Sequence, residues 1–268
     1  MEIVKIPAPL FELLETTPST MDAARANVVS GRVTFDAEGA PSSWGVLTEE
    51  QTAGRGQRGR VWHAVRGESL CATYYVRHRF ALPEEAGRIP LMAGVAVASQ
   101  VQRQIISGRV GLKWPNDILI GGRKAGGILV EMVRAPDGAW VALVGIGVNV
   151  LVSEFPEELR GFATSLALET SAPDALPSPQ ALALAIAGAL YACADAHDPV
   201  SFAAWIKQWR SLDATTGRRF ATEWDGAAVT GTAEGIDDQG ALLLRLDDGI
   251  LAAVTSASSL REISWPGR

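Results

Sequence analysis

The stretch that decides the fold is VGLKWPNDILIGGRKAGGILVEMVRAPDGAWVALVGIGVNV, residues 110–150. Three of its segments are rich in the apolar and β-branched residues that favour strands, namely 110–114, 126–134 and 140–150. The dipeptide Asp137-Gly138 lies between the last two segments and is typical of a tight turn, so we expect a β-hairpin there. Pro115 cannot continue an interior strand, and it therefore ends the first segment in a turn.

The chain on either side of this stretch adds further strands and several helices. We expect strands at 44–51 and 69–79 and helices at 19–27, 84–106, 179–196 and 199–210. Strands and helices do not alternate in a βαβ rhythm along the chain. The larger part is therefore expected to be α+β, with a mixed β-sheet and flanking helices.

The character of the sequence changes near residue 213. From Arg218 onward, short apolar runs are broken by turn signals roughly every 10 to 15 residues, at Asp225-Gly226, Gln239-Gly240 and Asp248-Gly249. We therefore expect two domains: residues 1–212, and a small β domain of residues 213–268 with about the size of an SH3-like barrel.

Composition excludes several classes of protein. The chain has 268 residues and a formal net charge of −6, which argues against nucleic acid as its main partner. Its two cysteines, Cys71 and Cys193, are too few for a disulfide framework. It has no apolar run near the ~20 residues that span a bilayer, and its first residues do not resemble a signal peptide. We expect a cytoplasmic protein without a membrane partner.

The most unusual segment is GRGQRGR, residues 54–60, whose glycines satisfy the pattern G-x-G-x-x-G. A dinucleotide site needs a helix after those glycines and an acidic residue about 20 positions later. Here Trp62 and a strand follow, and residues 74–79 contain no acid, so we reject that interpretation. Two others remain: a solvated basic loop, or a loop whose glycine N–H groups and arginines bind phosphate and which is mobile until an anion arrives.

A second charged motif favours the phosphate-binding interpretation. In KWPND, residues 113–117, a lysine, a tryptophan and an aspartate on one turn can bind phosphate, stack on a ring and coordinate Mg²⁺, respectively. An ordinary turn with locally bonded polar groups is the alternative. Lys124 follows at the start of an apolar strand, and Gly126-Gly127 leaves room for a ligand to approach the backbone.

These motifs together resemble the biotin protein ligases. They occur in the order Ser19-Thr20, Gln51-Thr52-Ala53, the loop of residues 54–60, KWPND, then KAGGILVE (124–131) and GIGVN (145–149). The resemblance covers nearly the whole chain, including the C-terminal β unit. It implies the biotin–lipoate ligase fold, similar to class II synthetases. It also implies that ATP activates biotin to biotinyl-5'-AMP and that the biotin is then transferred to a lysine of a biotin carboxyl carrier protein.

The resemblance also assigns roles to individual residues. The expected biotin-binding residues are Ser19, Thr20, Gln51, Gly54, Arg55, Gly56, Trp62, Lys124 and Gly127. The expected ATP- and adenylate-binding residues are Gln57, Arg58, Arg60, Lys113, Trp114, Asn116, Asp117 and Asn149. Lys124, Arg55 and Lys113 are expected to be catalytic, and Asp117 to hold Mg²⁺. For Trp62 and Asn149, purely structural roles in the core and at a strand end remain as alternatives.

Two positions depart from the family pattern, and two other functions stay open. Met21 stands where the family commonly has asparagine, and Gln57 where many members have an arginine that faces the adenylate. A lipoate or octanoate ligase, or an inactive ligase-like binding protein, is the alternative function. The Ser19-Thr20 motif leaves no room before it for the DNA-binding domain of some relatives, so we expect no DNA partner; homodimers are common in the family.

Overall fold

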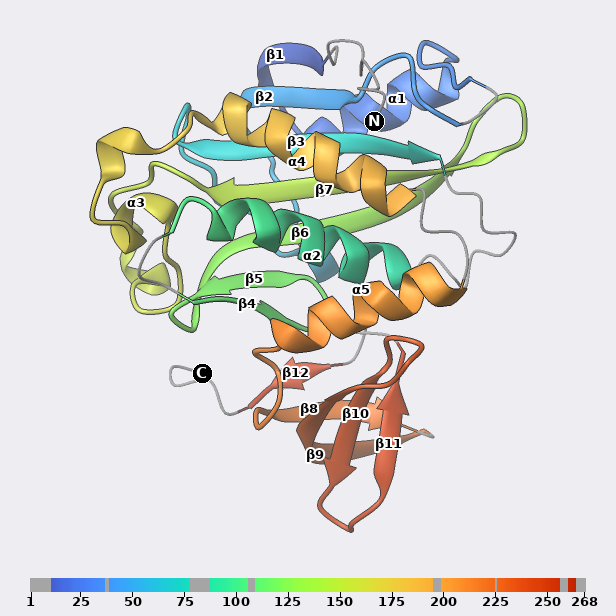
Figure 1. Ribbon diagram of the computed structural model, residues 1–268, viewed down its shortest axis with the longest axis vertical. Helices are drawn as coiled ribbons and strands as arrows, with labels where there is room; N and C mark the ends of the chain where they lie inside the picture. Colours follow the sequence, from blue (N-terminus) through green and yellow to red (C-terminus); the bar gives the residue numbers. More distant parts are fainter. Residues whose placement is uncertain are drawn as a thin grey trace, which may run out of the picture.

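The computed structural model describes residues 11–36, 39–77, 87–105, 109–194, 199–224, 226–255 and 260–263. Within these ranges the chain forms a seven-stranded and a five-stranded sheet (Figure 1). Helices lie against the larger sheet, and the smaller sheet lies beyond α5 at one end of the molecule. Residues 78–79, 84–86, 106 and 195–196 of the predicted strands and helices fall outside the described residues.

The larger sheet has the strand order β1-β2-β3-β7-β6-β5-β4. Its strands are β1 (Phe11–Thr17), β2 (Gly45–Gln51), β3 (Ser69–Arg77), β4 (Val110–Lys113), β5 (Asp117–Ile120), β6 (Arg123–Arg134) and β7 (Trp140–Asn149). Strands β1 and β2 are parallel and the other neighbours antiparallel, so the predicted mixed sheet is confirmed. The hairpin at Asp137-Gly138 is also present, with Gly138 at a φ of 84°.

Helices cover both faces of this sheet. They are α1 (Thr20–Val29), α2 (Arg88–Gln102), α3 (Leu166–Glu169), α4 (Pro179–Ala194) and α5 (Pro199–Ser211), with 3-10 turns η1 (Gln57–Gly59), η3 (Glu157–Leu159) and η4 (Pro173–Ala175). Successive side chains of a strand point to opposite faces. Tyr75 accordingly packs with Val28 of α1, whereas Tyr74 lies in the core with α2 and α4. The sheet is thus the middle layer, with α1 on one face and α2 and α4 on the other.

The smaller sheet is antiparallel and has the order β11-β10-β9-β8-β12. Its strands are β8 (Arg219–Trp224), β9 (Ala227–Ile236), β10 (Leu242–Leu246), β11 (Leu251–Val254) and β12 (Arg261–Glu262). The all-β character predicted for this end of the chain is therefore confirmed. Leu242, Leu244 and Ala252 are fully buried, and they belong to the same core as α2 and α4.

The two sheets meet at the beginning of the KWPND motif. Leu112 exchanges backbone hydrogen bonds with the linker after α5, donating to the Leu212 carbonyl at 2.7 Å and accepting from the Ala214 N–H at 2.9 Å. The backbone N–H of Trp114 donates to Thr215 Oγ1 at 2.8 Å, and its indole Nε1 donates to the Gly240 carbonyl at 3.0 Å. Trp114 is therefore an anchor between the two parts of the molecule.

Two strands were not predicted, and one of them corrects the expected turn. We expected Asn116 and Asp117 to lie in a turn; Asn116 does, but Asp117 begins β5 and pairs directly with Lys113 of β4. The turn comprises only residues 114–116. Strand β1 was also missed, because Phe11–Thr17 lacks a clean alternation of apolar and polar residues and lies at the edge of the sheet.

The contact between Trp114 and Gly240 predicts a specific loss of stability. Trp114→Phe keeps an aromatic ring between the two sheets. It leaves the buried Gly240 carbonyl without its hydrogen-bond donor, which costs about 1–3 kcal/mol of stability. We expect urea unfolding to show a decrease of this size in the free energy of unfolding. Trp140→Phe is the control, because Trp140 is only partly buried and its ring contacts the exposed Arg134 by a cation–π interaction, which a phenylalanine ring can keep. Equal losses in both variants would contradict the role of Trp114 as an anchor.

Candidate functional site

A cavity of about 400 Å³ opens beyond the N-terminal end of α1. Its walls come from parts of the chain that are far apart in sequence: the start of α1, the loop after β2, strands β3, β6 and β7, residues 158–162, and the smaller sheet. The cavity has one end with uncharged polar groups, a glycine-lined floor, and one end with charged groups. Each region is built differently.

The uncharged polar end is a network of three side chains. Gln51 Oε1 accepts from the Thr20 backbone N–H at 2.8 Å and from Thr20 Oγ1 at 3.1 Å. Thr73 Oγ1 in turn donates to Thr20 Oγ1 at 2.9 Å. Ser19 is the N-cap of α1, and its hydroxyl oxygen accepts from the Met21 N–H at 3.3 Å. The beginning of α1 therefore presents fixed hydroxyl groups to the cavity.

The floor is made by glycines on two neighbouring strands. A Cβ atom at Gly147 would lie 2.4 Å from Trp62 Cε2, so only glycine lets the indole lie against β7. At Gly145 a Cβ would lie 2.8 Å from Met21 Cε. Gly127 faces Lys124, whose Nζ would be 3.3 Å from a Cβ at that position. Because the glycines have no side chains, Trp62 and Met21 can lie against the sheet, and space remains above it.

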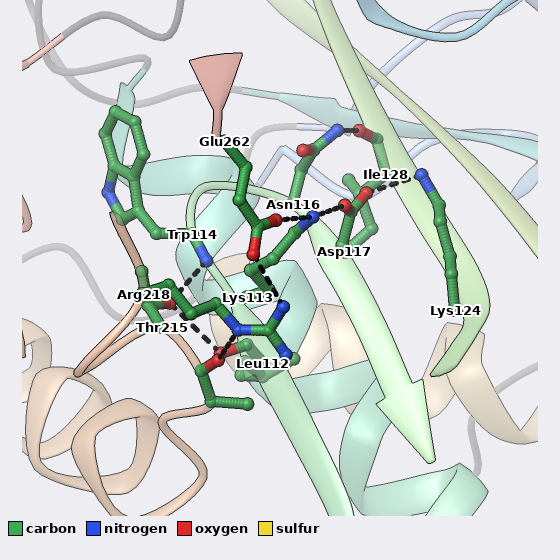
Figure 2. Close-up of polar contacts among 11 residues, drawn as sticks. Leu112, Lys113, Trp114, Asn116, Asp117, Lys124, Ile128, Thr215, Arg218 and Glu262 are labelled. Carbon is green, nitrogen blue, oxygen red and sulfur yellow. Dashed lines mark hydrogen bonds and ion pairs between the residues drawn. The ribbon is translucent and has the colours of Figure 1, made fainter. Parts of the chain in front are cut away.

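The charged end is a chain of five groups with alternating sign (Figure 2). Asp117 binds Lys124 through Oδ1 and Lys113 through Oδ2, the latter at 3.0 Å. Lys113 Nζ also lies 3.2 Å from Glu262 Oε2, and Glu262 Oε1 accepts from Arg218 Nη1 at 2.8 Å. Burial alone would raise the pKa of Asp117, but the positive charges of Lys124 and Lys113 outweigh it and lower that pKa to about 2. Asp117 therefore stays ionised at neutral pH.

Lys124 is held in place through its backbone. The pairing of β5 with β6 shifts in register between Ile118 and Leu119, and Lys124 lies next to this irregularity. Its N–H donates to the Phe162 carbonyl at 2.8 Å, and its carbonyl accepts from the Thr164 N–H at 2.9 Å. The segment after η3 thus runs beside Lys124 and fixes the position from which its side chain enters the cavity.

The glycine- and arginine-rich loop is held against α1. Arg55 forms a two-pronged ion pair with Asp22, at 2.6 Å and 3.0 Å. The hydrogen bonds that Arg55 donates to the Asp22 carboxylate raise the pKa of Arg55. The phosphate-binding interpretation expects this loop to be mobile until an anion arrives, and Asp22 supplies Arg55 with a counter-charge that the sequence pattern did not indicate. Gly54 is needed because a Cβ there would lie 2.7 Å from the Trp62 carbonyl oxygen.

Most of the residues predicted for the site line this cavity. They are Ser19, Thr20, Gln51, Arg55, Gly56, Gln57, Arg60, Trp62, Lys113, Trp114, Asn116, Asp117, Lys124 and Gly127. Gly54 and Asn149 are not among its lining residues, and the side chain of Arg58 lies outside the described structure. Asn149 ends β7 and its Nδ2 donates to the Thr164 carbonyl at 3.0 Å, a contact that is in line with the structural role at a strand end considered for it.

Two expectations for the KWPND motif need correction. We expected Trp114 to be free to stack on a ring, but its indole is buried and its N–H is bonded to Gly240, as described above. We expected Asp117 to hold Mg²⁺, but lysine ammonium groups occupy both of its oxygens. No cluster of three His, Cys, Asp or Glu residues that could hold a metal ion occurs in the described residues. The arrangement does not fit a metal ion bound to Asp117.

Several lining residues were missed from the sequence. Thr73, Leu159 and Phe162 line the cavity, and so do Phe220, Leu260 and Glu262 of the C-terminal part. Glu262 has no motif around it and lies 149 positions from its partner Lys113. A signal for the floor was present in GIGVN, whose alternating glycines face the cavity, but we had assigned a role only to Asn149.

No described helix is both long enough and apolar enough to cross a membrane.

Comparison with known proteins finds relatives that are identical to this chain at about a third of the aligned positions. The chain is 33% identical over 219 residues to the biotin–[acetyl-CoA-carboxylase] ligase of Mycobacterium tuberculosis, covering 80% of this chain and 77% of that protein. It is also 33% identical over 214 residues to the bifunctional ligase/repressor BirA of Bacillus subtilis. That match covers 79% of this chain but only 64% of the BirA protein, so the chain spans a little under two thirds of it.

Solved structures share the fold. A biotin protein ligase from Aquifex aeolicus, in complex with biotin and ATP, superposes with a TM-score of 0.74 at 23% identity, covering 94% of this chain and 99% of that chain. A biotin protein ligase from Leishmania major, in complex with biotinyl-5-AMP, has a TM-score of 0.59 at 25% identity, covering 93% of this chain and all of the other (100%). The fold implied by the sequence motifs is therefore confirmed.

Family models match both parts of the chain. The model of the biotin protein ligase C-terminal domain matches residues 220–264, which include all strands of the smaller sheet except the first residue of β8. The model of the biotin/lipoate A/B protein ligase family matches residues 14–150, half of the chain, from β1 through the glycine floor and both lysines. Together with the cavity built from the same segments, these matches show that the chain belongs to the biotin/lipoate A/B protein ligase family.

Proposed function

We propose that this chain is a biotin protein ligase. The biotin carboxylate attacks the α-phosphorus of ATP, and pyrophosphate leaves with the electron pair of the broken bond to give biotinyl-5'-AMP. A lysine amine of a biotin carboxyl carrier domain then attacks the acyl carbon. AMP leaves, the amine loses a proton, and an amide bond remains. The relatives named as biotin–[acetyl-CoA-carboxylase] ligases support this choice of substrates and partner.

The observation that carries the proposal is the position of Lys124 between the two ends of the cavity. Its Nζ lies beside Gly127 on the floor and 5.9 Å from the centre of the Trp62 ring, and it also binds Asp117 at the charged end. A group at this place can face a carboxylate from one side and a phosphate from the other. Two anions repel each other as they approach, and a fixed ammonium group offsets that repulsion.

The uncharged polar end suits the ring system of biotin. A mostly apolar ligand with one ureido group needs a few fixed donors and acceptors on otherwise apolar walls. Thr20, Gln51 and Thr73 supply hydroxyl and amide groups that their own network holds in position. Trp62 and the glycine floor supply the flat apolar surface. Biotin bound with its ring system at this end directs its carboxylate toward Lys124.

The charged end suits ATP. Lys113 lies at this end and Arg60 lines the same cavity, and the lining residues Leu159, Phe162 and Leu260 supply apolar surface against which an adenine ring can pack. The first step needs no general base, because a carboxylate is already ionised at neutral pH. Catalysis then depends on placing the two substrates and on stabilising the negative charge of the phosphate oxygens. Asp117 serves this purpose by holding Lys113 and Lys124 at the same place.

The loop of residues 54–60 is suited to cover the intermediate. A mixed anhydride is open to attack by water, so a segment that closes over it protects it. Arg55 is held by Asp22 at an exposed contact, which an anionic ligand can replace at low cost. Gln57 and Arg60 line the cavity from the same loop.

The alternatives from the sequence are less well supported. A lipoate or octanoate ligase needs a long apolar channel for its acyl chain, whereas here a hydroxyl and amide network faces the cavity. An inactive binding protein would have no need for Lys113, Asp117 and Lys124, which are all ordered around the cavity. The experiments below separate these functions.

Removing the central ammonium group tests the proposal. We expect Lys124→Ala to lower the rate of ATP-dependent biotin transfer to a carrier domain by about 100-fold or more, since it removes charge stabilisation at the reacting phosphate. Mass spectrometry of the carrier measures the transfer. Lys207→Ala, at an exposed position on α5, is the control and should transfer at the wild-type rate. Full activity of the Lys124→Ala variant, or transfer of lipoate in place of biotin by the wild type, contradicts the proposal.

The low pKa of Asp117 predicts a pH-dependent contribution to stability. Asp117→Asn removes the charge that Lys113 and Lys124 share, although Lys113 keeps its contact with Glu262, so we expect the free energy of unfolding at pH 7 to fall by about 2 kcal/mol. Because folding lowers this pKa to about 2, the contribution is complete above the ordinary carboxyl pKa and is lost as the pH falls through about 2. The difference between variant and wild type should therefore be constant from pH 7 to about 4 and shrink below.

Urea unfolding at several pH values measures this difference. Asp247→Asn is the control, because Asp247 pairs with Arg219 on the exposed surface of the smaller sheet and its loss should cost little. A difference for Asp117→Asn that is the same at pH 3 as at pH 7 is the result that contradicts the assigned pKa.

The residue at position 57 should affect how tightly the enzyme holds biotinyl-5'-AMP. A neutral glutamine in the wall of the cavity attracts the adenylate less than an arginine would. We expect Gln57→Arg to slow the release of biotinyl-5'-AMP, measured by trapping the released intermediate when the carrier is omitted. Gln57→Met, which changes no charge, is the control and should release it at the wild-type rate. If the arginine variant also releases it at the wild-type rate, the idea is wrong.

A further inference from the structure

The C-terminal sheet contributes a carboxylate to the charged end of the cavity. Glu262 lies on β12, the last strand of the smaller sheet, and its side chain lines the cavity with only 11% of its surface exposed. Its partner Lys113 ends β4 of the larger sheet and is 17% exposed. A contact between two such shielded charges is stronger and more directional than an ion pair on the surface.

Each carboxylate oxygen of Glu262 has its own partner. Oε1 accepts from Arg218 at 2.8 Å, and Oε2 accepts from Lys113 at 3.2 Å (Figure 2). Arg218 is fixed in turn, because its Nε donates to the Ala214 carbonyl at 2.7 Å in the linker between the sheets. The backbone of Glu262 is set by the pairing of β12 with β8. The carboxylate therefore has a fixed direction before any ligand binds.

Lys113 lies between two carboxylates that come from different parts of the chain. Asp117 lies 3.0 Å away on the neighbouring strand and Glu262 3.2 Å away on the other sheet. A lysine has a long flexible side chain, and one partner restricts its ammonium group far less than two partners at different angles. Asp117 also has to hold Lys124, so Glu262 is the partner that binds Lys113 and not Lys124.

We propose that Glu262 is a positioning residue that fixes Lys113 for the adenylation step. The inference rests on the proposed function and adds the contribution of the C-terminal sheet to it. Glu262 itself bears a negative charge and would repel the phosphates of ATP. Its benefit comes through Lys113, whose ammonium group it keeps in one place.

This arrangement predicts a split between the two kinetic constants for ATP. Glu262→Gln removes one negative charge, so the attraction of the site for ATP is not reduced and KM for ATP should stay the same or fall. Lys113 loses one of its two carboxylates and its fixed place, so kcat for biotin-dependent pyrophosphate exchange should fall about tenfold. A rise in KM for ATP with kcat unchanged would mean that Glu262 binds the nucleotide directly, and that result overturns the inference.

A double-mutant cycle shows whether Glu262 acts through Lys113. We expect Glu262→Gln to have no further effect on kcat once Lys113→Met is present, because there is no ammonium group left to position. Additive losses from the two changes contradict the inference. Glu234→Gln is the matched control: it removes a carboxylate of the same sheet that pairs with Arg245 at 2.9 Å and does not line the cavity. It should leave kcat unchanged.

A measurement on the ligand-free protein tests the contact itself. Acetylation of Lys113 by acetic anhydride, quantified by mass spectrometry, should become several times faster in Glu262→Gln, while acetylation of the exposed Lys207 stays the same. Unchanged labelling of Lys113 overturns the inference. A wild type without biotin-dependent exchange overturns the proposed function, whereas a wild type with exchange and an unaffected Glu262→Gln variant overturns this inference alone.

Discussion

The site depends on one carboxylate, that of Asp117, which holds two ammonium groups close together in a partly buried place. Without it Lys113 and Lys124 would repel each other, and Lys124 would lose the carboxylate that compensates for its reduced hydration, while Lys113 would still contact Glu262. Asp117 can bind both because it begins β5, directly opposite Lys113 on β4 and one strand away from Lys124 on β6. The three short strand ends thus bring the charges together, and the sheet holds them there before any ligand arrives.

The rest of the architecture keeps this cluster in place and keeps the space beside it open. Trp114 and Leu112 join the cluster to the smaller sheet through backbone and indole hydrogen bonds, so β12 can supply Glu262. On the other side, Gly147 and Gly127 leave the sheet surface bare, and Trp62 lies on it. The uncharged polar end and the charged end therefore lie on one continuous surface of the cavity. The proposed reaction uses both ends, since it brings a carboxylate to a phosphate.

The sequence predicted the parts with strong local signals and missed those that depend on distant contacts. The hairpin at Asp137-Gly138, the helix expected at 19–27 and the all-β C-terminal end follow from short patterns, and the structure confirms them. Strand β5 was missed because four residues beside a proline turn carry no clear period. Asp22 and Glu262 could not be found, because an ion pair with a residue 33 or 149 positions away leaves no local pattern. The roles of Trp114 and Asp117 needed correction for the same reason: their partners are set by tertiary structure.

The central claim is that the cavity joins biotin to ATP as an adenylate, and biotin-dependent exchange of labelled pyrophosphate into ATP tests it most directly. The assay needs no carrier protein, so it isolates the first chemical step from the choice of partner. The account predicts exchange when biotin is present and none with lipoate or octanoate in its place. Exchange that depends on lipoate or octanoate, or no exchange with any of the three acids, would contradict it.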